Sequence, residues 1–393
     1  MKTAAILSLL PLALALPGQK RSGGSAPILK PRDVEALLEN KYIIKMKDDV
    51  SQASIDHVDE LFEGEAYQKW DADKQFKGLA AQISEEALEA IAELEDVEYI
   101  EQDAIIKIDY VPEEISTTET AKRALTSQTA ASWGLGRISH TARVLTPYVY
   151  DTSAGSGVCA YFGGRATFLA NYADSSNTDG NGHGTHVAGT IGGSTYGVAK
   201  QVTLYGVKVL DASGSGTNSG VISGINYVAT DAPKRSCSSV ANMSLGGAKS
   251  TAVNSAAAAL VRAGVFLAVA AGNNAASAAN YSPASETTAC TVGATTSSDS
   301  FATYSNYGSI VDILAPGSSI VSSYIGSTSA TATLSGTSMA SPHVAGLGAY
   351  FLALRGSMTP AALCTYIRNN AISGVITGVP SGTPNLLAYN GAA

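Results

Sequence analysis

The chain has 393 residues, which is more than one average domain holds, so two folded units and a targeting segment are expected. Only 15% of the residues are charged, while glycine, alanine and serine are abundant, which fits a compact protein with a large core and many tight turns. Neither half of the chain has the dense basic patch of a nucleic-acid-binding protein, so that class is excluded.

The amino terminus has the pattern of a secretory signal peptide. Lys2 is followed by an apolar run at residues 4–10 and by alternating leucine and alanine up to Pro17. Residues 1–16 are too short to span a membrane, and no other stretch of about 18 apolar residues follows. The sequence therefore predicts a protein exported to the extracellular space without a membrane anchor. A buried amino-terminal helix is the alternative.

Charge divides the rest of the chain into two parts. Up to Arg123 there are 14 Lys and Arg against 25 Asp and Glu, a net charge of −11, and the remainder has 11 against 8, a net charge of +3. Residues 117–123 are polar, lack apolar periodicity and end in Lys122-Arg123, which indicates an exposed, cleavable link. We expect an acidic segment (17–123) that partners a mildly basic domain (124–393) and is later removed.

The acidic segment has the pattern of a small α+β unit with a folded core at about residues 41–108. Residues 18–40 are predicted to be a linker. Ser84 is the expected N-cap of the second helix. The apolar periodicity predicts, in order, a strand at 41–47, a helix at 51–62, a strand at 76–83, a helix at 84–94 and strands at 97–101 and 104–108.

After residue 124 apolar runs alternate with Gly, Ser and Asn turns. The runs predict strands that begin at 156 and cover 202–210, 240–245 and 265–271, with helices at 221–230 and 252–263. Near-continuous apolar strands that alternate with helices indicate a parallel sheet covered on both faces. Ligands of such sheets bind beyond the carboxyl ends of the strands, so we expect the chemistry there.

Ser338 is the candidate nucleophile. It lies in Gly-Thr-Ser-Met-Ala-Ser-Pro-His at residues 336–343, where a turn leads into a long apolar segment. Small neighbours let a carbonyl group approach the hydroxyl, and a helix start would direct its free N–H groups at an oxygen that gains charge. A serine hydroxyl needs a base supplied from elsewhere in the chain. A plain N-capping serine is the alternative for this motif taken alone.

Two further motifs supply groups that such a serine needs. His183 begins His-Gly-Thr-His-Val-Ala-Gly-Thr at residues 183–190, and the glycines beside it leave one edge of the ring open. Zinc binding by His183 and His186 is the weaker alternative, because no glutamate lies between them as in a His-Glu-x-x-His helix. Asn273 ends a buried apolar strand and could donate to a developing oxyanion, with a turn asparagine as the alternative.

Two glycine-containing segments could present backbone edges to a substrate, since an extended peptide can add to such an edge as a further strand. These segments consist of Gly214, Ser215 and Gly216, and of Ser244, Leu245 and Gly246. The four cysteines of the chain favour disulfides over metal ligands, because the count is even in an exported protein and no Cys-x-x-Cys pair occurs. Three pairings are open from the sequence alone.

Together these motifs resemble the subtilisin-like serine proteases, or subtilases, and within them the secreted fungal enzymes of the proteinase K type. The resemblance covers residues 133–390. It implies a three-layer α/β fold with a central parallel sheet, preceded by a ferredoxin-like inhibitory propeptide. It further implies His183 as general base, Ser338 as nucleophile and Asn273 as oxyanion donor, with the two glycine-containing segments as the substrate-pairing backbone. His186 and His343 fall on non-catalytic positions of the family.

The resemblance also implies covalent and metal links. The cysteines are expected to pair as Cys159–Cys237 and Cys290–Cys364. Asp312 falls on the calcium carboxylate of the family, with backbone oxygens of Thr287 and Ala289 beside it, and a plain turn carboxylate is the alternative for Asp312. Thr141 falls on a second, weaker cation position. Catalysis needs no cofactor.

The resemblance fails at one place. The family carries its catalytic aspartate in an Asp-Thr/Ser-Gly motif at the end of the first core strand. Residues 156–161 begin that strand, but residues 162–167 resemble sequence well past the motif, so about a dozen residues and the aspartate are absent. Asp151, Asp174 and Asp179 match other positions of the family. An error in the gene model is the favoured explanation, ahead of an impaired homologue and of a variant that uses another carboxylate.

The sequence as a whole predicts a monomeric secreted serine endopeptidase of broad specificity. Its expected partners are protein and peptide substrates and its own propeptide, with neither nucleic acid nor membrane. The alternative is a catalytically impaired homologue that binds peptide or propeptide without efficient cleavage. The missing aspartate favours the second possibility, and the intact Ser338, His183 and Asn273 favour the first.

Overall fold

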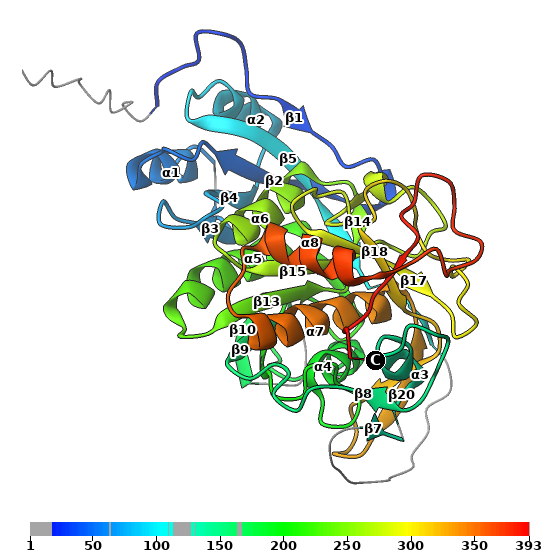
Figure 1. Cartoon of the computed structure of the whole chain (residues 1–393). Coiled ribbons are helices and arrows are strands. Elements are labelled where there is room, and N and C mark those ends of the chain that lie inside the picture. The colour runs from blue at the N-terminus through cyan, green and yellow to red at the C-terminus, as the bar shows by residue number, and fades with distance from the viewer. Residues whose placement is uncertain are drawn as a thin grey trace, which may run out of the picture.

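The computed structural model describes residues 18–62, 64–108, 110–112, 127–129, 131–162 and 167–392. The predicted signal peptide at residues 1–16 and the predicted link at Lys122-Arg123 lie outside these ranges. Within the described part of the chain, no helix is both long and apolar enough to cross a membrane. We call residues 18–108 the amino-terminal unit and residues 127–392 the carboxyl-terminal unit. Figure 1 shows the first, in blue and cyan, stacked on the second.

The amino-terminal unit is a sheet with two helices on one face. Side chains of the strands and of both helices share one apolar core, which includes Ile44, Ile55 and Ile91. Ser51 and Ser84 cap the helices as acceptors from backbone N–H groups, and Ser84 was predicted to do so. The strand order is β1 (Ile28–Leu29), β5 (Val97–Lys107), β2 (Leu37–Met46), β4 (Gly78–Gln82) and β3 (Gln68–Trp70), and the helices are α1 (Gln52–Asp59) and α2 (Glu85–Ala92).

Three details of this unit differ from the sequence prediction. The strands expected at 97–101 and 104–108 are one strand, β5, because the polar residues between them are buried rather than exposed in a turn. Strand β3 was not predicted. Residues 18–40, expected to be a linker, contain β1, a 3-10 helix η1 (Val34–Ala36) and the start of β2. The order β2-α1-β3-β4-α2-β5 is ferredoxin-like, as expected.

The carboxyl-terminal unit is built on a nine-stranded sheet. Every neighbouring pair is parallel except the pair β22–β21 at one edge, so the predicted α/β fold class is confirmed. The strand order is β10 (Thr167–Asn171), β11 (Thr203–Lys208), β9 (Val158–Phe162), β13 (Ser238–Met243), β15 (Phe266–Ala270), β17 (Cys290–Thr295), β18 (Ile313–Pro316), β22 (Leu386–Leu387) and β21 (Ile372–Ser373).

Helices cover both faces of this sheet. Helices α5 (Asn218–Asp231) and α6 (Thr251–Arg262) share one core with alternate strand residues such as Ala241. Helices α4 (His183–Gly192) and α7 (Thr337–Arg355) share the other core with the intervening residues such as Val240. The remaining elements are β6 (Val111–Pro112), β7 (Ser127–Gln128), α3 (Trp133–Arg137), β8 (Tyr148–Val149), β12 (Ser215–Thr217), η2 (Ala232–Lys234), β14 (Gly247–Ala248), η3 (Ala278–Asn280), β16 (Tyr281–Ser282), β19 (Ile320–Ser323), β20 (Thr331–Ser335) and α8 (Pro360–Asn370).

Two disulfides cross-link the carboxyl-terminal unit. Cys159 at the start of β9 bonds to Cys237, and Cys290 at the start of β17 bonds to Cys364 in α8. Both pairings implied by the resemblance are confirmed. Each bond closes a loop of more than 70 residues, which is worth about 4 kcal/mol in the chain-entropy model.

The two units meet through β5, which carries two buried carboxylates to two helix starts. Glu101 accepts hydrogen bonds from the hydroxyl of Ser250 and from the backbone N–H groups of Thr251 and Ala252, at the start of α6. Asp103 accepts from the N–H and the hydroxyl of Ser219, in the first turn of α5, at 3.3 and 2.6 Å. The unpaired N–H groups of a helix start attract negative charge, so these contacts stabilise the interface. An apolar cluster that contains Trp70, Phe76 and residues of α5 and α6 also spans the two units.

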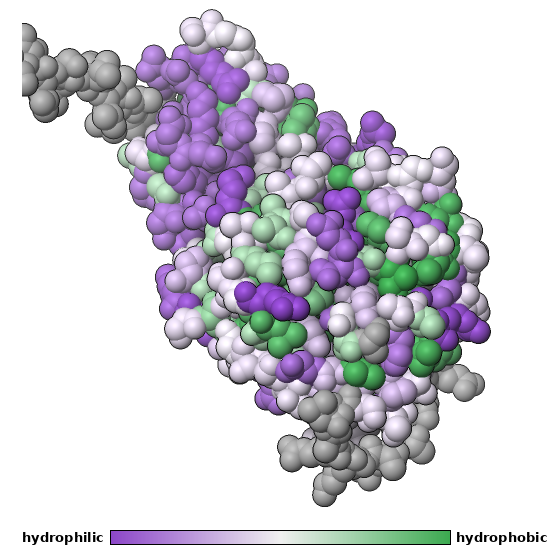
Figure 2. Space-filling model, viewed as in Figure 1, coloured by the Kyte–Doolittle hydropathy of each residue, from purple (hydrophilic) through white to green (hydrophobic). Residues whose placement is uncertain are grey.

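The surface is consistent with this charge-based pairing. Figure 2 shows the amino-terminal unit as mostly hydrophilic, whereas the visible face of the carboxyl-terminal unit is paler with hydrophobic patches. Glu101 and Asp103 are buried acidic residues of this unit, since each side chain is at most 1% exposed. Burial raises the pKa of both carboxyl groups, and the donors at the helix starts oppose that rise.

Glu101→Ala should destabilise the full chain by about 1–3 kcal/mol, because three donors at the start of α6, two of them buried, lose their acceptor. The urea midpoint of the Ser338→Ala chain, chosen to prevent self-cleavage, measures the effect. Glu98→Ala on the same strand is the matched control, because Glu98 is half exposed and its ion pair among the described residues is with Lys45. Equal midpoints for the two variants would show that Glu101 does not hold the units together.

Candidate active site

Strand β5 ends between the two segments predicted to bind substrate. It pairs antiparallel with β12, so that Lys107 lies opposite Ser215 and Ile106 opposite Gly216. On its other side Lys107 forms a bridge with Gly246, and the two residues exchange both backbone hydrogen bonds, at 3.4 and 3.2 Å. The amino-terminal unit therefore fills the groove between the segments as an extended peptide would.

Ser338 lies in the first turn of α7, directly after the tight turn at Gly336. Its hydroxyl donates to the carbonyl oxygen of Ser244 at 3.4 Å, and the hydroxyl of Ser244 donates to the carbonyl oxygen of Ser338 at 2.8 Å. Strand β13 thereby fixes the candidate nucleophile next to one of the substrate segments. Ser338 is 2% exposed while β5 occupies the groove.

Two residues that the sequence analysis missed support this arrangement. The amide nitrogen of Asn242 donates to the Ser244 hydroxyl at 2.9 Å, and the Ser341 hydroxyl donates to the amide oxygen of Asn242 at 2.7 Å. A buried polar network thus joins β13 to the first turn of α7. Asn242 ends a buried apolar strand, as Asn273 does, and that position was the available signal.

His183 is the first residue of α4, which packs against α7. It is 6% exposed, and its Nε2 atom is buried with no hydrogen-bond partner among the described residues. Burial lowers the pKa of His183 to about 4, and the nearby charge of Asp179 opposes this shift. The ring is therefore neutral near pH 7, the form that a general base requires.

Tyr110 covers His183, with 5.4 Å between the ring centroids. Neither Tyr110 nor the following strand β6 was predicted to belong to the site. Strand β6 pairs antiparallel with β20, with Val111 opposite Ser335, three residues before Ser338. Residues 110–112 therefore link His183 to the strand that leads to the candidate nucleophile.

Asn273 follows β15 and lies next to α7. Its amide oxygen accepts from the N–H and the hydroxyl of Thr337 at 2.7 and 2.9 Å. Since Thr337 precedes Ser338, these bonds fix the amide group beside the candidate nucleophile. They occupy the oxygen end, so the nitrogen end is the one that can donate to an oxyanion.

The other two histidines of these motifs lie in the core. His186 and His343 are fully buried, and each makes hydrogen bonds to backbone carbonyl oxygens. Burial lowers the pKa of His186 to about 3 and the pKa of His343 to about 4. These contacts fit the structural role that the resemblance implies for both residues.

No carboxylate among the described residues makes a hydrogen bond or ion pair with the His183 ring. Asp179, the nearest charge named above, uses its oxygens on the N–H groups of Asn181, Gly182 and Thr185. Asp151 caps a turn at Ser153, and Asp174 binds Lys208. The aspartates left unassigned from the sequence therefore all have other partners.

A cavity of about 1180 Å³ opens next to His183 and reaches into the core. It is lined by Tyr161 at the end of β9, by Val207 of β11, by Ile225 of α5 and by Met243 of β13. Strand β9 is an interior strand of the sheet, between β11 and β13, and ends at residue 162. Tyr161 near the end of β9 and His183 therefore line the same cavity.

The predicted calcium ligands divide into two groups. Asp312 accepts from the N–H of Thr291 at 2.9 Å, which ties its carboxylate to the segment that contains Thr287 and Ala289. Its other oxygen accepts from Arg368 at 3.3 Å. Calcium prefers hard oxygen ligands such as this carboxylate, and the Arg368 guanidinium would compete with a cation for it. Thr141 is exposed in a bend after α3, and no described acidic side chain hydrogen-bonds to it.

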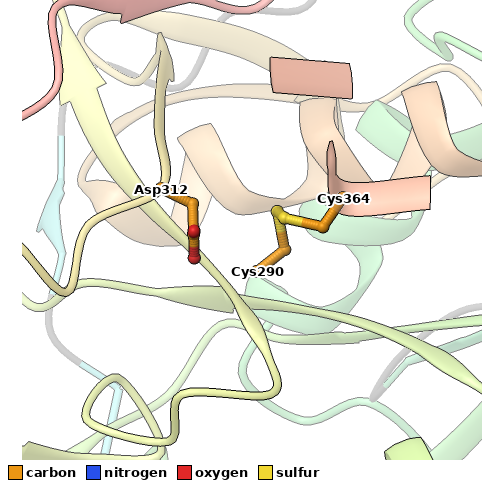
Figure 3. A group of neighbouring side chains, drawn as sticks. All are labelled: Cys290, Asp312 and Cys364. Carbon is orange, nitrogen blue, oxygen red and sulfur yellow. A yellow bond between two sulfur atoms is a disulfide. The ribbon is translucent and has the colours of Figure 1, made fainter. Parts of the chain in front are cut away.

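Figure 3 shows the carboxylate of Asp312 beside the Cys290–Cys364 disulfide. Among the residues described, these three form the group of potential metal-binding side chains whose ligand atoms lie within 4.8 Å of one another. Both sulfur atoms are bonded to each other, so neither is a thiolate that could bind a metal. A cation here would depend on oxygen ligands.

The three buried histidines predict a loss of stability at mildly acidic pH. A histidine with a folded-state pKa of about 3 or 4 binds fewer protons than in the unfolded chain, where its pKa is about 6.5. The free energy of unfolding should therefore fall as the pH decreases from about 6.5 to about 4. The urea midpoint of the Ser338→Ala chain at pH 7 and at pH 5 measures this, and His343→Gln should reduce the difference. An unchanged midpoint would contradict the assignment.

Comparisons with known proteins agree with this geometry. The subtilase family model matches residues 166–391, and the peptidase inhibitor I9 model matches residues 41–109. A "Cuticle-degrading protease" of Metarhizium anisopliae is 48% identical over 407 aligned positions, with 100% of both chains covered. The "Subtilisin-like serine protease AsES" of Sarocladium strictum is 51% identical over 100% of this chain and 99% of that protein.

A solved structure gives the same result. The crystal structure of a cold adapted subtilisin-like serine proteinase matches this structure with a TM-score of 0.62, and the two sequences are 45% identical. The match covers 67% of this chain and 99% of that one. The third of this chain that is not matched is large enough to contain the amino-terminal unit. The fold, the two family matches and the full-length relatives show that the chain belongs to the subtilase family of serine proteases, with an I9-type inhibitor unit before the peptidase domain.

Proposed function

We propose that this subtilase is a secreted endopeptidase of broad specificity in which Ser338, His183 and Asn273 carry out acyl transfer. Ser338 attacks a peptide carbonyl group, His183 takes its proton, and Asn273 stabilises the oxyanion. The observation that carries the proposal is the position of Ser338, which is held by β13 at the end of a groove that already contains an extended peptide strand.

The groove also bears on the choice of substrate. Segments 214–216 and 244–246 bind β5 through backbone atoms, which every peptide presents, so the pairing selects for extended conformation rather than for sequence. Proteins and peptides are accordingly the substrates, and the inhibitor unit is the intramolecular partner. The proposed oligomeric state is a monomer. The proposed domains are a signal peptide at residues 1–16, the inhibitory propeptide at 17–123 and the peptidase domain at 124–393.

We further propose that a segment with the catalytic aspartate is missing from the chain after Tyr161. The cavity at the end of β9 supports this, because it exposes residues of the sheet and of α5 to a space beside His183. The alignment with the Metarhizium protease supports it as well, since its 407 positions exceed the 393 residues of this chain by 14. The relatives named above are all proteases, so an impaired peptide binder has no support among them.

Labelling with a serine-directed phosphonyl fluoride tests the role of Ser338. We expect covalent labelling at Ser338, loss of labelling and of peptide hydrolysis in Ser338→Ala, and a decrease in kcat of about 10²–10³-fold in Asn273→Ala. Asn274→Ala is the matched control, because it removes the same kind of side-chain amide from the next residue and leaves Asn273 in place. If the two asparagine variants have the same kcat, Asn273 does not stabilise the oxyanion. If Ser338 is not labelled, the proposed reaction is wrong.

We also propose a structural calcium ion at Asp312 with carbonyl oxygens of Thr287 and Ala289. Calcium should raise the melting temperature of the full-length Ser338→Ala chain, and Asp312→Asn should abolish that increase. Arg368→Gln should enlarge the increase, because it removes the positive charge that now pairs with Asp312. Differential scanning fluorimetry in calcium and in chelator measures these shifts. An increase that persists in Asp312→Asn would place the ion elsewhere.

A further inference from the structure

We infer that Tyr324 is a positioning residue for His183, an inference that rests on the proposed function of Ser338 as nucleophile and His183 as base. Tyr324 directly follows β19, far from His183 in the sequence, and no sequence motif pointed to it. The contacts of its ring and its hydroxyl group instead show that it holds the turn that leads into His183.

Asp179 holds this turn from one side. One of its carboxylate oxygens accepts from the N–H groups of Asn181 and Gly182 at 3.1 and 2.8 Å. The other accepts from the N–H and the hydroxyl of Thr185 at 2.8 and 2.7 Å. The side-chain oxygen of Asn181 accepts from the N–H of His183 at 3.3 Å. These bonds close the turn against the first turn of α4.

Tyr324 holds the same turn from another side. Its hydroxyl donates to the carbonyl oxygen of Asn181 at 2.9 Å. Its ring packs against Gly182, where an added Cβ atom would lie 2.4 Å from the Cζ atom of the ring. Gly182 also has a φ of 94°, in the left-handed region that favours glycine. The glycine before His183 therefore permits both the turn and the close contact with Tyr324.

Tyr324 belongs to a hairpin that also leads to the candidate nucleophile. Strands β19 and β20 pair antiparallel over residues 320–323 and 331–334. The N–H of Tyr324 donates to the carbonyl oxygen of Ala330 at 2.8 Å, which extends this pairing by one residue. Strand β20 then leads into the first turn of α7, which contains Ser338. One hairpin is therefore linked to Ser338 by the chain and to the turn before α4 by Tyr324.

The hairpin has a second attachment to α4, one turn after the candidate base. The Nε2 atom of His186 donates to the carbonyl oxygens of Ile320 and Ala332 at 2.9 and 3.2 Å. The hydroxyl of Ser322 donates to the carbonyl oxygen of His186 at 2.8 Å. These bonds do not involve Tyr324. Loss of the Tyr324 side chain should therefore leave α4 attached to the hairpin and loosen the turn at its start.

The rate constant for phosphonyl fluoride labelling of Ser338, measured against pH in the full chain, tests the inference. Tyr324→Ala should lower the rate at pH 8 by about tenfold, because the base is no longer held at the nucleophile. Tyr324→Phe keeps the ring against Gly182 and should lower the rate by about threefold, the effect of one lost hydrogen bond. Tyr148→Phe is the matched control, because the Tyr148 hydroxyl also donates to a backbone carbonyl oxygen, that of Val198. The control should lower the melting temperature and leave the labelling rate unchanged.

The pH at which labelling reaches half of its maximal rate separates positioning from general destabilisation. Burial lowers the pKa of His183 to about 4. In Tyr324→Ala the ring gains contact with water, so this midpoint should rise toward the ordinary pKa of histidine, about 6.5. The substitution leaves the titratable groups near the ring in place, namely Asp179, His186 and Tyr110. The control should not move the midpoint.

Each other outcome contradicts the inference. An unchanged or higher labelling rate in both Tyr324 variants would show that Tyr324 does not position His183, and would leave the proposed function intact. The same holds if Tyr148→Phe slows labelling and moves the midpoint as much as Tyr324→Phe does. Melting temperatures show whether each variant is folded, and Tyr324→Phe decides the question if Tyr324→Ala is not. An unaltered chain in which Ser338 is labelled at no pH would contradict the proposed function, and this inference with it.

Discussion

Strand β5 begins in the core of the amino-terminal unit and ends in the groove of the peptidase unit, hydrogen-bonded on both sides. Along its length it buries Glu101 and Asp103 against two helix starts and then places Lys107 between the two glycine-containing segments. The same eleven residues therefore hold the two units together and exclude other peptides from the groove. Inhibition here is a consequence of strand pairing.

Apolar packing accompanies these hydrogen bonds at the interface of the two units. Trp70 and Phe76 of the amino-terminal unit share one buried apolar cluster with Ile222 of α5 and Val253 of α6. The two buried carboxylates, which accept from helix N–H groups, add specific contacts to this apolar interface. The first 123 residues are acidic and the remainder has a net charge of +3, so the charges of the two parts are complementary.

Much of this could be predicted from the sequence, and the exceptions have physical causes. Periodicity located both helices of the first unit and four of the nine strands in the main sheet of the second, and the motifs at His183 and Ser338 identified the two candidate catalytic residues. Strand β5 was divided in two because Gln102 and Asp103 look like turn residues when the helix partner of Asp103 is unknown. Tyr110 was missed because its role depends on a contact with His183 from a distant part of the chain.

The central claim is that backbone pairing of β5 blocks the groove, and Lys107→Pro tests it most directly. Proline removes the N–H that donates to Gly246, whereas Lys107→Ala alters only an exposed side chain and keeps the backbone bonds. The rate of phosphonyl fluoride labelling at Ser338 is measured in both variants. Several-fold faster labelling of Lys107→Pro is the predicted result. Equal rates would mean that the groove is closed by something other than the strand pairing described above.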